Sequence, residues 1–305
     1  MRYTTSICEY TSSYMFERIL IFGSDGQLAQ AIFRSAPALS VCTALNRHEA
    51  DITDPKEVSG AMDRLAPALV INGAAYNAVD LAEGKGEQAA ELINAHGPAV
   101  LAAECTKRGT PLVHFSTDLV FDGSQRAAYE ESDPTRPLNV YGVTKLAGEN
   151  AVISASCQNY VIRVCRLFGP PANPAQGTAK KPYGNFPRLM LRLAHEEGRV
   201  KVVNDQIGTP TYTPDLAKAI WELVASSSGG LYHLSNAGEV SYSDYAHEIF
   251  RLSGVACEVD AVTTEEYGAP AVRPKYSVMD NAKANSAGVA PLRDWRAALA
   301  EYLAE

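Results

Sequence analysis

The feature that most constrains this fold is a repeated alternation of short apolar runs with longer, helix-like stretches. The apolar runs cover residues 18–22, 41–45, 68–72, 110–115, 160–165 and 230–234. Continuous apolar runs of this length are typical of strands that are buried on both faces of a sheet. Helix-like stretches between them, such as 87–108, 139–155 and 213–226, favour parallel strands joined by crossovers. We therefore predict a Rossmann-type doubly wound parallel α/β sheet, with a second, smaller α/β lobe.

The first apolar run leads into a turn that contains two glycines. Gly23 permits a tight turn, and Gly26 lets the backbone approach a pyrophosphate at the start of the next helix. Two glycines alone are equally well explained by an ordinary turn. Together with a parallel sheet, they predict a dinucleotide-binding crossover formed by Gly23, Asp25, Gly26, Gln27 and Leu28.

The end of the second apolar run bears on which dinucleotide binds. In such folds an acidic residue here selects NAD, and a cation accommodates the 2′-phosphate of NADP. The run ends at Asn46 and Arg47, without an acidic residue. We therefore expect NADPH as the cofactor, with NADH as the alternative.

Tyr141 and Lys145 are four residues apart in a helix-like stretch, so they share one face of the predicted helix. At roughly 5 Å and an effective dielectric constant of about 20, the ammonium would favour the phenolate by about 3 kcal/mol. The pKa of Tyr141 would then fall towards neutrality, and its hydroxyl could act as a general acid or base. An isolated YxxxK is more often an ordinary exposed helix turn. Here, however, Thr117 ends the fourth strand at the same edge of the sheet, and this context favours a functional role for Tyr141 and Lys145.

Composition argues against several other roles. The net charge of −8 argues against a nucleic-acid-binding or anionic-membrane-binding surface. The six cysteines are scattered without a CxxC pair, which favours free thiols and a cytoplasmic location. No apolar run approaches the ~18 residues that span a bilayer. Residues 1–14 lack the apolar core of a signal peptide, and we expect them to be a disordered extension.

Three longer motifs carry a family resemblance. They are STDLVFDG from Ser116, NVYGVTKLAGE from Asn139 and NDQIGTPT from Asn204. In this combination they resemble the extended short-chain dehydrogenase/reductase superfamily and, within it, the dTDP-4-dehydrorhamnose reductases. The resemblance covers nearly the whole chain from Met15 onwards.

The resemblance implies reduction of the 4-keto group of a nucleotide-activated 6-deoxy sugar, which we expect to be dTDP-linked and to serve polysaccharide synthesis. Thr117 would hydrogen-bond the carbonyl oxygen, Tyr141 would protonate the alkoxide, and Lys145 would tune the phenol and hold the nicotinamide ribose. The further cofactor-binding residues implied are Asn46, Arg47, Asp51, Ile52, Gly73, Ala74, Ala75, Tyr76 and Asn94. The substrate-binding residues implied are Tyr76, Thr117, Asp118, Leu119, Arg166 and Arg273.

The chain departs from the family pattern in three places. Cys165 and Arg166 stand where the family usually has a serine and a tryptophan, so a cation replaces an aromatic platform and leaves the sugar's identity open. Residues 170–182 form a longer segment than expected, either a flap over the substrate or a surface insertion. Ala31 stands where metal-binding members carry a glutamate, so we expect no metal.

Two domains and several partners follow from these inferences. We expect a cofactor domain of residues 15–169 plus 209–237 and a substrate lobe of residues 170–208 plus 238–305. A homodimer is compatible with the resemblance. The competing hypotheses are an NADP-binding regulatory subunit, similar to that of methionine adenosyltransferase, and a nucleotide-sugar epimerase that holds NAD.

Overall fold

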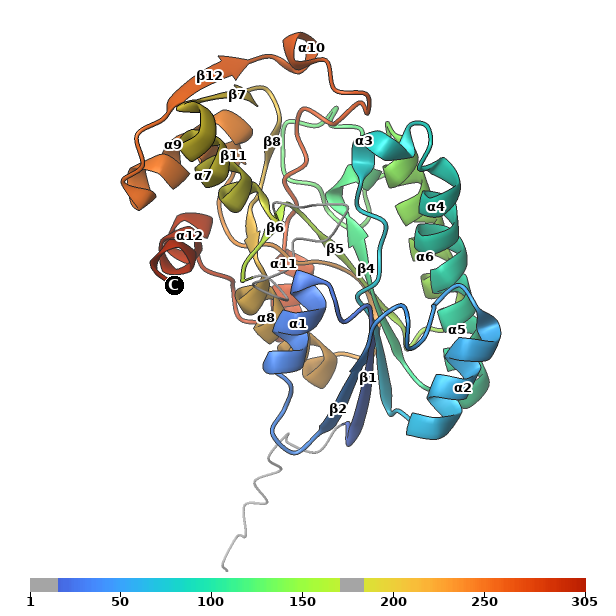
Figure 1. Cartoon of the computed structure of the whole chain (residues 1–305). Helices are drawn as coiled ribbons and strands as arrows, with labels where there is room; N and C mark the ends of the chain where they lie inside the picture. Colours follow the sequence, from blue (N-terminus) through green and yellow to red (C-terminus); the bar gives the residue numbers. More distant parts are fainter. Residues whose placement is uncertain (1–15, 171–183) are drawn as a thin grey trace, which may run out of the picture.

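The computed structural model of the chain describes residues 16–170 and 184–305 (Figure 1). The expected extension at residues 1–14 and nearly all of the segment 170–182 therefore lie outside the described residues.

Six parallel strands form the central sheet, in the order β2-β1-β3-β4-β5-β10. Their bounds are Arg18–Phe22 (β1), Val41–Leu45 (β2), Leu69–Asn72 (β3), Leu112–Thr117 (β4), Tyr160–Val164 (β5) and Gly230–His233 (β10). Every residue of β3, β4 and β5 is buried, as their continuous apolar runs predict. The predicted parallel, doubly wound sheet is confirmed.

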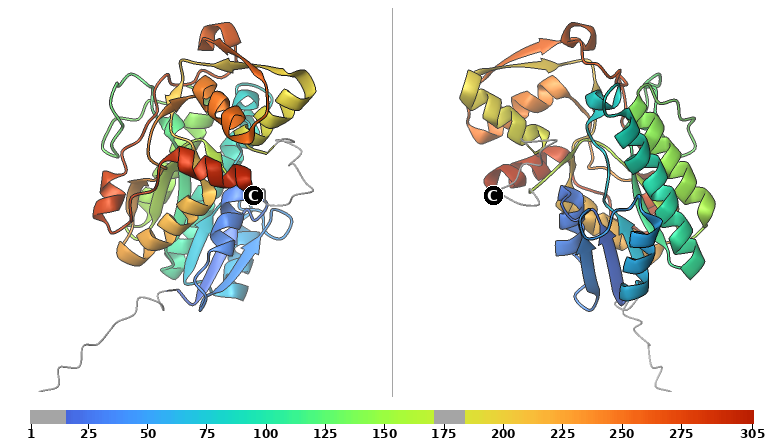
Figure 2. Two further views of the ribbon diagram at one scale, coloured as in Figure 1. Left: turned by 90° about the vertical axis from the view of Figure 1, so that its left-hand side faces the viewer. Right: turned by 45° about the vertical axis from the view of Figure 1, so that its right-hand side comes forward.

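Helices cover both faces of the sheet because side chains alternate along each strand. Helices lie on both faces of the sheet in Figure 2. Leu20 and Phe22 of β1 pack in the core of one helical layer, and Ile19 and Ile21 pack in the core of the other. The first layer contains α2 (Pro55–Leu65), α5 (Gly97–Arg108) and α6 (Val140–Ala155). The second contains α1 (Gln27–Arg34), α8 (Thr213–Ser226) and α11 (Ala282–Ser286).

The predicted helix at 87–108 is interrupted by one turn of π-helix. It consists of α4 (Glu87–Glu91), a π-helical turn at Leu92–His96 and α5, preceded by the short α3 (Val79–Ala82). Such turns are frequent at functional sites. In this chain the π-turn carries the buried Asn94 towards the loop that follows β3.

A smaller α/β lobe lies beyond the carboxyl ends of the strands (Figure 1). Its core centres on the fully buried Trp295 and is built from α7 (Phe186–Glu197), α9 (Tyr242–Ser253), α12 (Trp295–Ala304) and the parallel pair β7 (Arg199–Val203) and β12 (Glu258–Val262). The remaining elements are α10 (Thr264–Tyr267) and the strands β6 (Leu167–Phe168), β8 (Ile207–Gly208), β9 (Thr211–Tyr212) and β11 (Val240–Ser241). The exact division of the chain into two domains stays a prediction, and α11, within the expected lobe segment, packs against β10 of the large sheet.

Candidate active site

The turn after β1 lies close to the loop after β3 at the carboxyl edge of the sheet. Gly23 has φ +81°, and a Cβ atom placed on it would lie 2.5 Å from the backbone nitrogen of Ala74. No side chain caps the first turn of α1, which begins after Gly26. The first-turn N–H groups of this helix can therefore bind an anion.

Replacing Gly23 by alanine should separate these two loops. We expect the free energy of unfolding to fall by at least about 2 kcal/mol, because the new methyl group meets backbone atoms and left-handed geometry costs alanine about 1–2 kcal/mol. The dissociation constant for NADPH should rise at least tenfold. Urea unfolding and fluorescence titration measure these effects. Gly60→Ala is the matched control, because nothing lies within 4 Å of its added methyl group and alanine favours the helix; equal stability of the two variants would contradict this prediction.

The loop after β2 places Arg47 beside Asp51. The guanidinium Nε lies 3.0 Å from the Asp51 carboxylate, and the arginine side chain is 64% exposed. Asn46 is turned back on its own loop, where its Oδ1 accepts hydrogen bonds from the backbone of His48 and Glu49. An NADP 2′-phosphate bound at this edge would interact with the Arg47 guanidinium, which also pairs with the Asp51 carboxylate.

Asn94 holds the loop after β3 in place. Its side chain accepts a hydrogen bond from Tyr76 N at 2.8 Å and donates one to Tyr76 O at 3.0 Å. Both residues are buried. Asn94 thereby fixes the path of Gly73, Ala74 and Ala75 without facing solvent itself.

Tyr141 and Lys145 lie one turn apart on the buried face of α6, with exposed fractions of only 9% and 3%. The Tyr141 hydroxyl donates to Oδ1 of Asn77 at 3.4 Å. The Lys145 ammonium donates to the Phe115 carbonyl oxygen in β4. Sheet and helix thus bring together three side chains, those of Thr117, Tyr141 and Lys145, that the sequence predicted as a set.

The predicted effect of Lys145 on the phenol is wrong for this structure. Burial raises the pKa of Tyr141, and the charge of Asp118 raises it further, while a hydrogen bond with Thr117 acts in the opposite direction. Burial also lowers the pKa of Lys145 to about 8, opposed by Glu149. The sequence-based prediction counted only the attraction between the two charges, at an effective dielectric constant of about 20, and omitted the cost of moving a phenolate out of water. Tyr141 is therefore a protonated phenol, the form that can donate a proton.

A buried ion pair lies below this site. Arg163 of β5 donates from Nε to Glu149 of α6 at 3.0 Å, and both side chains are at most 4% exposed. His233 of β10 lies beside the same guanidinium. The sequence analysis missed this pair, although a charged residue inside each of two apolar elements was a visible signal.

Arg166, which follows β5, contacts residues of the smaller lobe. Its guanidinium stacks on the ring of Tyr242 at 3.8 Å and donates to the carbonyl oxygens of Val240 and Gln206, each at 2.8 Å. Its backbone is in the left-handed region, with φ +44°. The ring of Tyr242, from α9, therefore lies against the guanidinium of Arg166.

Arg273 reaches across from the C-terminal segment to α3. It donates to both carboxylate oxygens of Asp80, at 2.9 and 2.8 Å, and this hydrogen bonding with Asp80 contributes to raising its pKa. Binding a substrate pyrophosphate through Arg273 would require exchange of this carboxylate. Its substrate-binding role stays a prediction.

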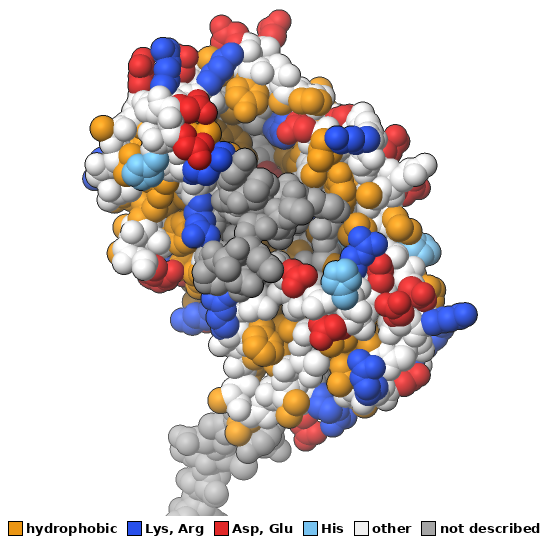
Figure 3. Space-filling view, in the orientation of Figure 1, with side chains coloured by type: hydrophobic (Ala, Val, Ile, Leu, Met, Phe, Trp, Pro, Cys, Tyr) orange, Lys and Arg blue, Asp and Glu red, His pale blue; other side chains and the backbone are white. Residues whose placement is uncertain are grey.

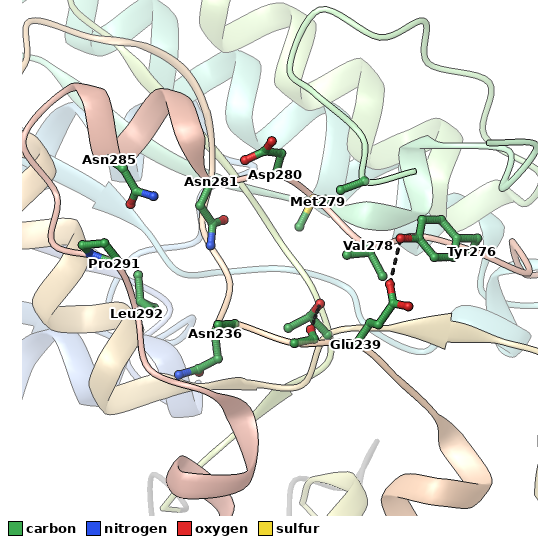
Figure 4. Close-up of a pocket in the computed structure, with 14 residues that line it drawn as sticks. Asn236, Glu239, Tyr276, Val278, Met279, Asp280, Asn281, Asn285, Pro291 and Leu292 are labelled. Carbon is green, nitrogen blue, oxygen red and sulfur yellow. Dashed lines mark hydrogen bonds between the residues drawn. The ribbon is translucent and has the colours of Figure 1, made fainter. Parts of the chain in front are cut away.

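A cavity of about 390 Å³ is lined by none of the predicted site residues (Figure 4). Asn236, Glu239, Tyr276 and Asn281 line it, and none of them belongs to the predicted site. Glu239 accepts a hydrogen bond from Tyr276, and Asn281 is bonded to the backbone of Ser235. These polar groups are satisfied by the fold.

The comparisons with known proteins agree with this geometry. The model of the RmlD substrate binding domain family matches residues 17–305. A dTDP-4-dehydrorhamnose reductase from Streptomyces griseus is 40% identical over 301 residues, which cover 95% of this chain and 94% of the relative. The chain belongs to the dTDP-4-dehydrorhamnose reductase family.

Other members of the family are similar as well, and a more distant protein shares the fold. A dTDP-4-keto-6-deoxy-D-glucose reductase from Streptomyces niveus is 38% identical, with 94% of this chain and 96% of the relative covered. The structure of a dTDP-4-dehydrorhamnose reductase from Bacillus anthracis in complex with NADP has a TM-score of 0.88 at 34% identity and covers 95% of this chain and 99% of that one. A UDP-glucose 4-epimerase from Thermus thermophilus, at 19% identity and a TM-score of 0.78, shares the fold.

In this member of the reductase family, two residues beside the predicted catalytic set were not foreseen. Oδ1 of Asn77 accepts a hydrogen bond from the Tyr141 hydroxyl, and Asn77 directly follows the predicted Tyr76. Ser277 donates to the Asp118 carboxylate from 159 positions away in the chain. Sequence spacing could have suggested Asn77, whereas only tertiary contacts reveal Ser277.

Proposed function

We propose that this protein is an NADPH-dependent reductase that converts the 4-keto group of a dTDP-linked 6-deoxy sugar to an alcohol. The observation that carries this proposal is the placement of Tyr141 and Lys145 one turn apart on the buried face of α6, with Thr117 at the carboxyl end of β4. The family membership supports the same reaction.

The residues present fit an NADP cofactor. No described side chain caps the start of α1, so its first backbone N–H groups are free to bind a pyrophosphate, and Gly23 keeps the turn before this helix close to Ala74. Arg47 offers a cation for the 2′-phosphate. When bound, the cofactor supplies the hydride. Lys145 would hold the nicotinamide ribose, and Asn94 would keep the loop from Gly73 to Tyr76 in position.

In the proposed reaction, Tyr141 gives its proton to the substrate oxygen as hydride reaches C4. The electron pair of the C=O double bond moves to this oxygen, which then takes the phenol proton. Arg166, Tyr242 and Arg273 are proposed to lie along the sugar nucleotide.

Turnover with a panel of 4-keto nucleotide sugars tests the proposal. NADPH consumption with a dTDP-4-keto-6-deoxy sugar, and detection of the reduced sugar, are the expected results. Tight NADP binding without turnover of any panel member would instead support a regulatory subunit. Conversion of a 4-hydroxy sugar to its epimer without net NADPH consumption would support an epimerase.

Location and assembly belong to the same proposal. The described cysteines, Cys42, Cys105, Cys157, Cys165 and Cys257, are free thiols, which favours a reducing cytoplasm. Within residues 16–170 and 184–305, no helix is long and apolar enough to cross a membrane.

Acidic and basic side chains are interspersed on the face seen in Figure 3. A homodimer is our proposal for the assembly, and light scattering during size-exclusion chromatography tests it.

Arg47→Ala should change cofactor preference more than catalysis. We expect the KM for NADPH to rise about tenfold, because the cation for the 2′-phosphate is lost, while the KM for NADH stays within about twofold. Steady-state kinetics with both cofactors measure this difference. Arg199→Ala is the control, since Arg199 pairs with Asp260 in the small lobe. Equal loss for NADPH and NADH would show that Arg47 does not contact the 2′-phosphate.

A further inference from the structure

Asp118 is a buried carboxylate that directly follows the predicted catalytic threonine. Only 6% of the residue is exposed. Its Oδ1 accepts a hydrogen bond from Oγ1 of Thr117 at 3.1 Å, and its Oδ2 accepts from Sγ of Cys165 at 3.1 Å and Oγ of Ser277 at 2.6 Å. All three donors are neutral. Burying a carboxylate is costly unless hydrogen bonds replace water, so this arrangement holds Asp118 in one orientation.

The first consequence concerns the direction of the Thr117 hydroxyl. A hydroxyl group has a single proton to donate, and in this structure Thr117 gives it to Asp118. The same oxygen accepts the backbone N–H of Leu119 at 3.2 Å. Asp118 and Leu119 together therefore fix the direction of the Thr117 hydroxyl, and its donation to a substrate carbonyl would require the proton to turn away from Asp118.

The second consequence concerns what holds Asp118. Cys165 directly follows β5, so one donor comes from the neighbouring strand of the sheet. Ser277 belongs to the C-terminal segment, is 3% exposed, and is fixed by its own N–H bond to Ile207 O at 2.9 Å. Ile207 lies in β8, which pairs with β11 before α9 of the small lobe. The Asp118 carboxylate, which directly follows β4, is thus hydrogen-bonded to the C-terminal segment that contains Ser277.

We propose that Asp118 is a positioning residue of the reduction, which directs the Thr117 hydroxyl and is itself held by Ser277 and Cys165. This inference rests on the proposed reductase function. Asp118 gives up and takes up no proton in the reaction, because the substrate oxygen takes its proton from Tyr141.

The principal test compares kcat with the KM for NADPH in Asp118→Asn. We expect kcat to fall about 10- to 100-fold, in the range for groups that orient a site from behind, with the KM for NADPH within about twofold. Asp122→Asn is the matched control: this carboxylate is in the same loop but bonds to Ser124 and Tyr129, so kcat should not change.

A further variant separates orientation from charge. Ser277→Ala keeps the carboxylate but removes one hydrogen bond, and should lower kcat about 3- to 10-fold. Wild-type kcat in Asp118→Asn would overturn the proposal. If that variant fails to fold by circular dichroism, an unchanged kcat in Ser277→Ala would overturn it instead.

A structural readout keeps this inference separate from the proposed function. Crystal structures of the wild type and of Ser277→Ala show the orientations of Asp118 and Thr117 without any turnover. We expect both side chains to rotate or become disordered in the variant, and unchanged orientations would contradict the positioning role. Absence of turnover in the wild type would contradict the proposed function alone.

Discussion

Tyr141→Phe should bind NADPH like the wild-type protein and lose about 10²- to 10⁴-fold in kcat, the range expected for removal of a general acid. The ring would keep its place, because Tyr141 packs with Tyr76, Ala82 and Ala90 in a small buried cluster. Only the proton donor and its hydrogen bond to Asn77 are lost. Single-turnover kinetics with a dTDP-4-keto-6-deoxy sugar would measure the chemical step directly.

A tyrosine outside the site provides the control for this prediction. Tyr267 at the end of α10 is 51% exposed, and Tyr267→Phe should leave kcat unchanged. Retention of full activity in Tyr141→Phe would remove Tyr141 as the proposed acid. Loss of NADPH affinity together with kcat would indicate a structural effect instead.

Arg163→Met should lower the free energy of unfolding by about 3–5 kcal/mol, because it leaves Glu149 buried without its cation. The methionine has a similar shape, so packing accounts for little of the loss. Burial of His233 lowers its pKa, so this neighbouring histidine is a poor replacement for the lost cation. Urea denaturation followed by circular dichroism would measure the change.

An exposed ion pair gives the comparison. Arg251 lies 2.7 Å from Glu248, with its own side chain 66% exposed, and Arg251→Met should leave the urea midpoint nearly unchanged. The double variant Arg163→Met, Glu149→Leu should recover much of the stability lost in Arg163→Met, because no buried charge remains unpaired. A double variant as unstable as the single one would show that packing, rather than the buried charge, causes the loss.

The architecture was predictable because its signals are local. The apolar runs at 18–22 and 68–72 could be buried on both faces only in a parallel sheet covered by helices, and they became β1 and β3. The turn at Gly23 follows from the same reasoning, since few residues other than glycine adopt φ +81°. A four-residue spacing likewise placed Tyr141 and Lys145 on one face of α6.

The electrostatics of the site were decided by the tertiary structure. A helical spacing places an ammonium near a phenol, but burial and the charge of Asp118 determine the direction in which the phenol pKa moves. Each of Arg166, Arg273 and Asp118 also has a non-local partner that lies 40 or more positions away in the chain, namely Gln206, Asp80 and Ser277 respectively. Local sequence determines which dihedral angles and faces each segment prefers, whereas desolvation and ion pairing depend on the groups that distant segments bring together. For this protein, the fold and the identity of the candidate acid were therefore determined by the sequence alone, and the protonation state of that acid was decided by the packing around it.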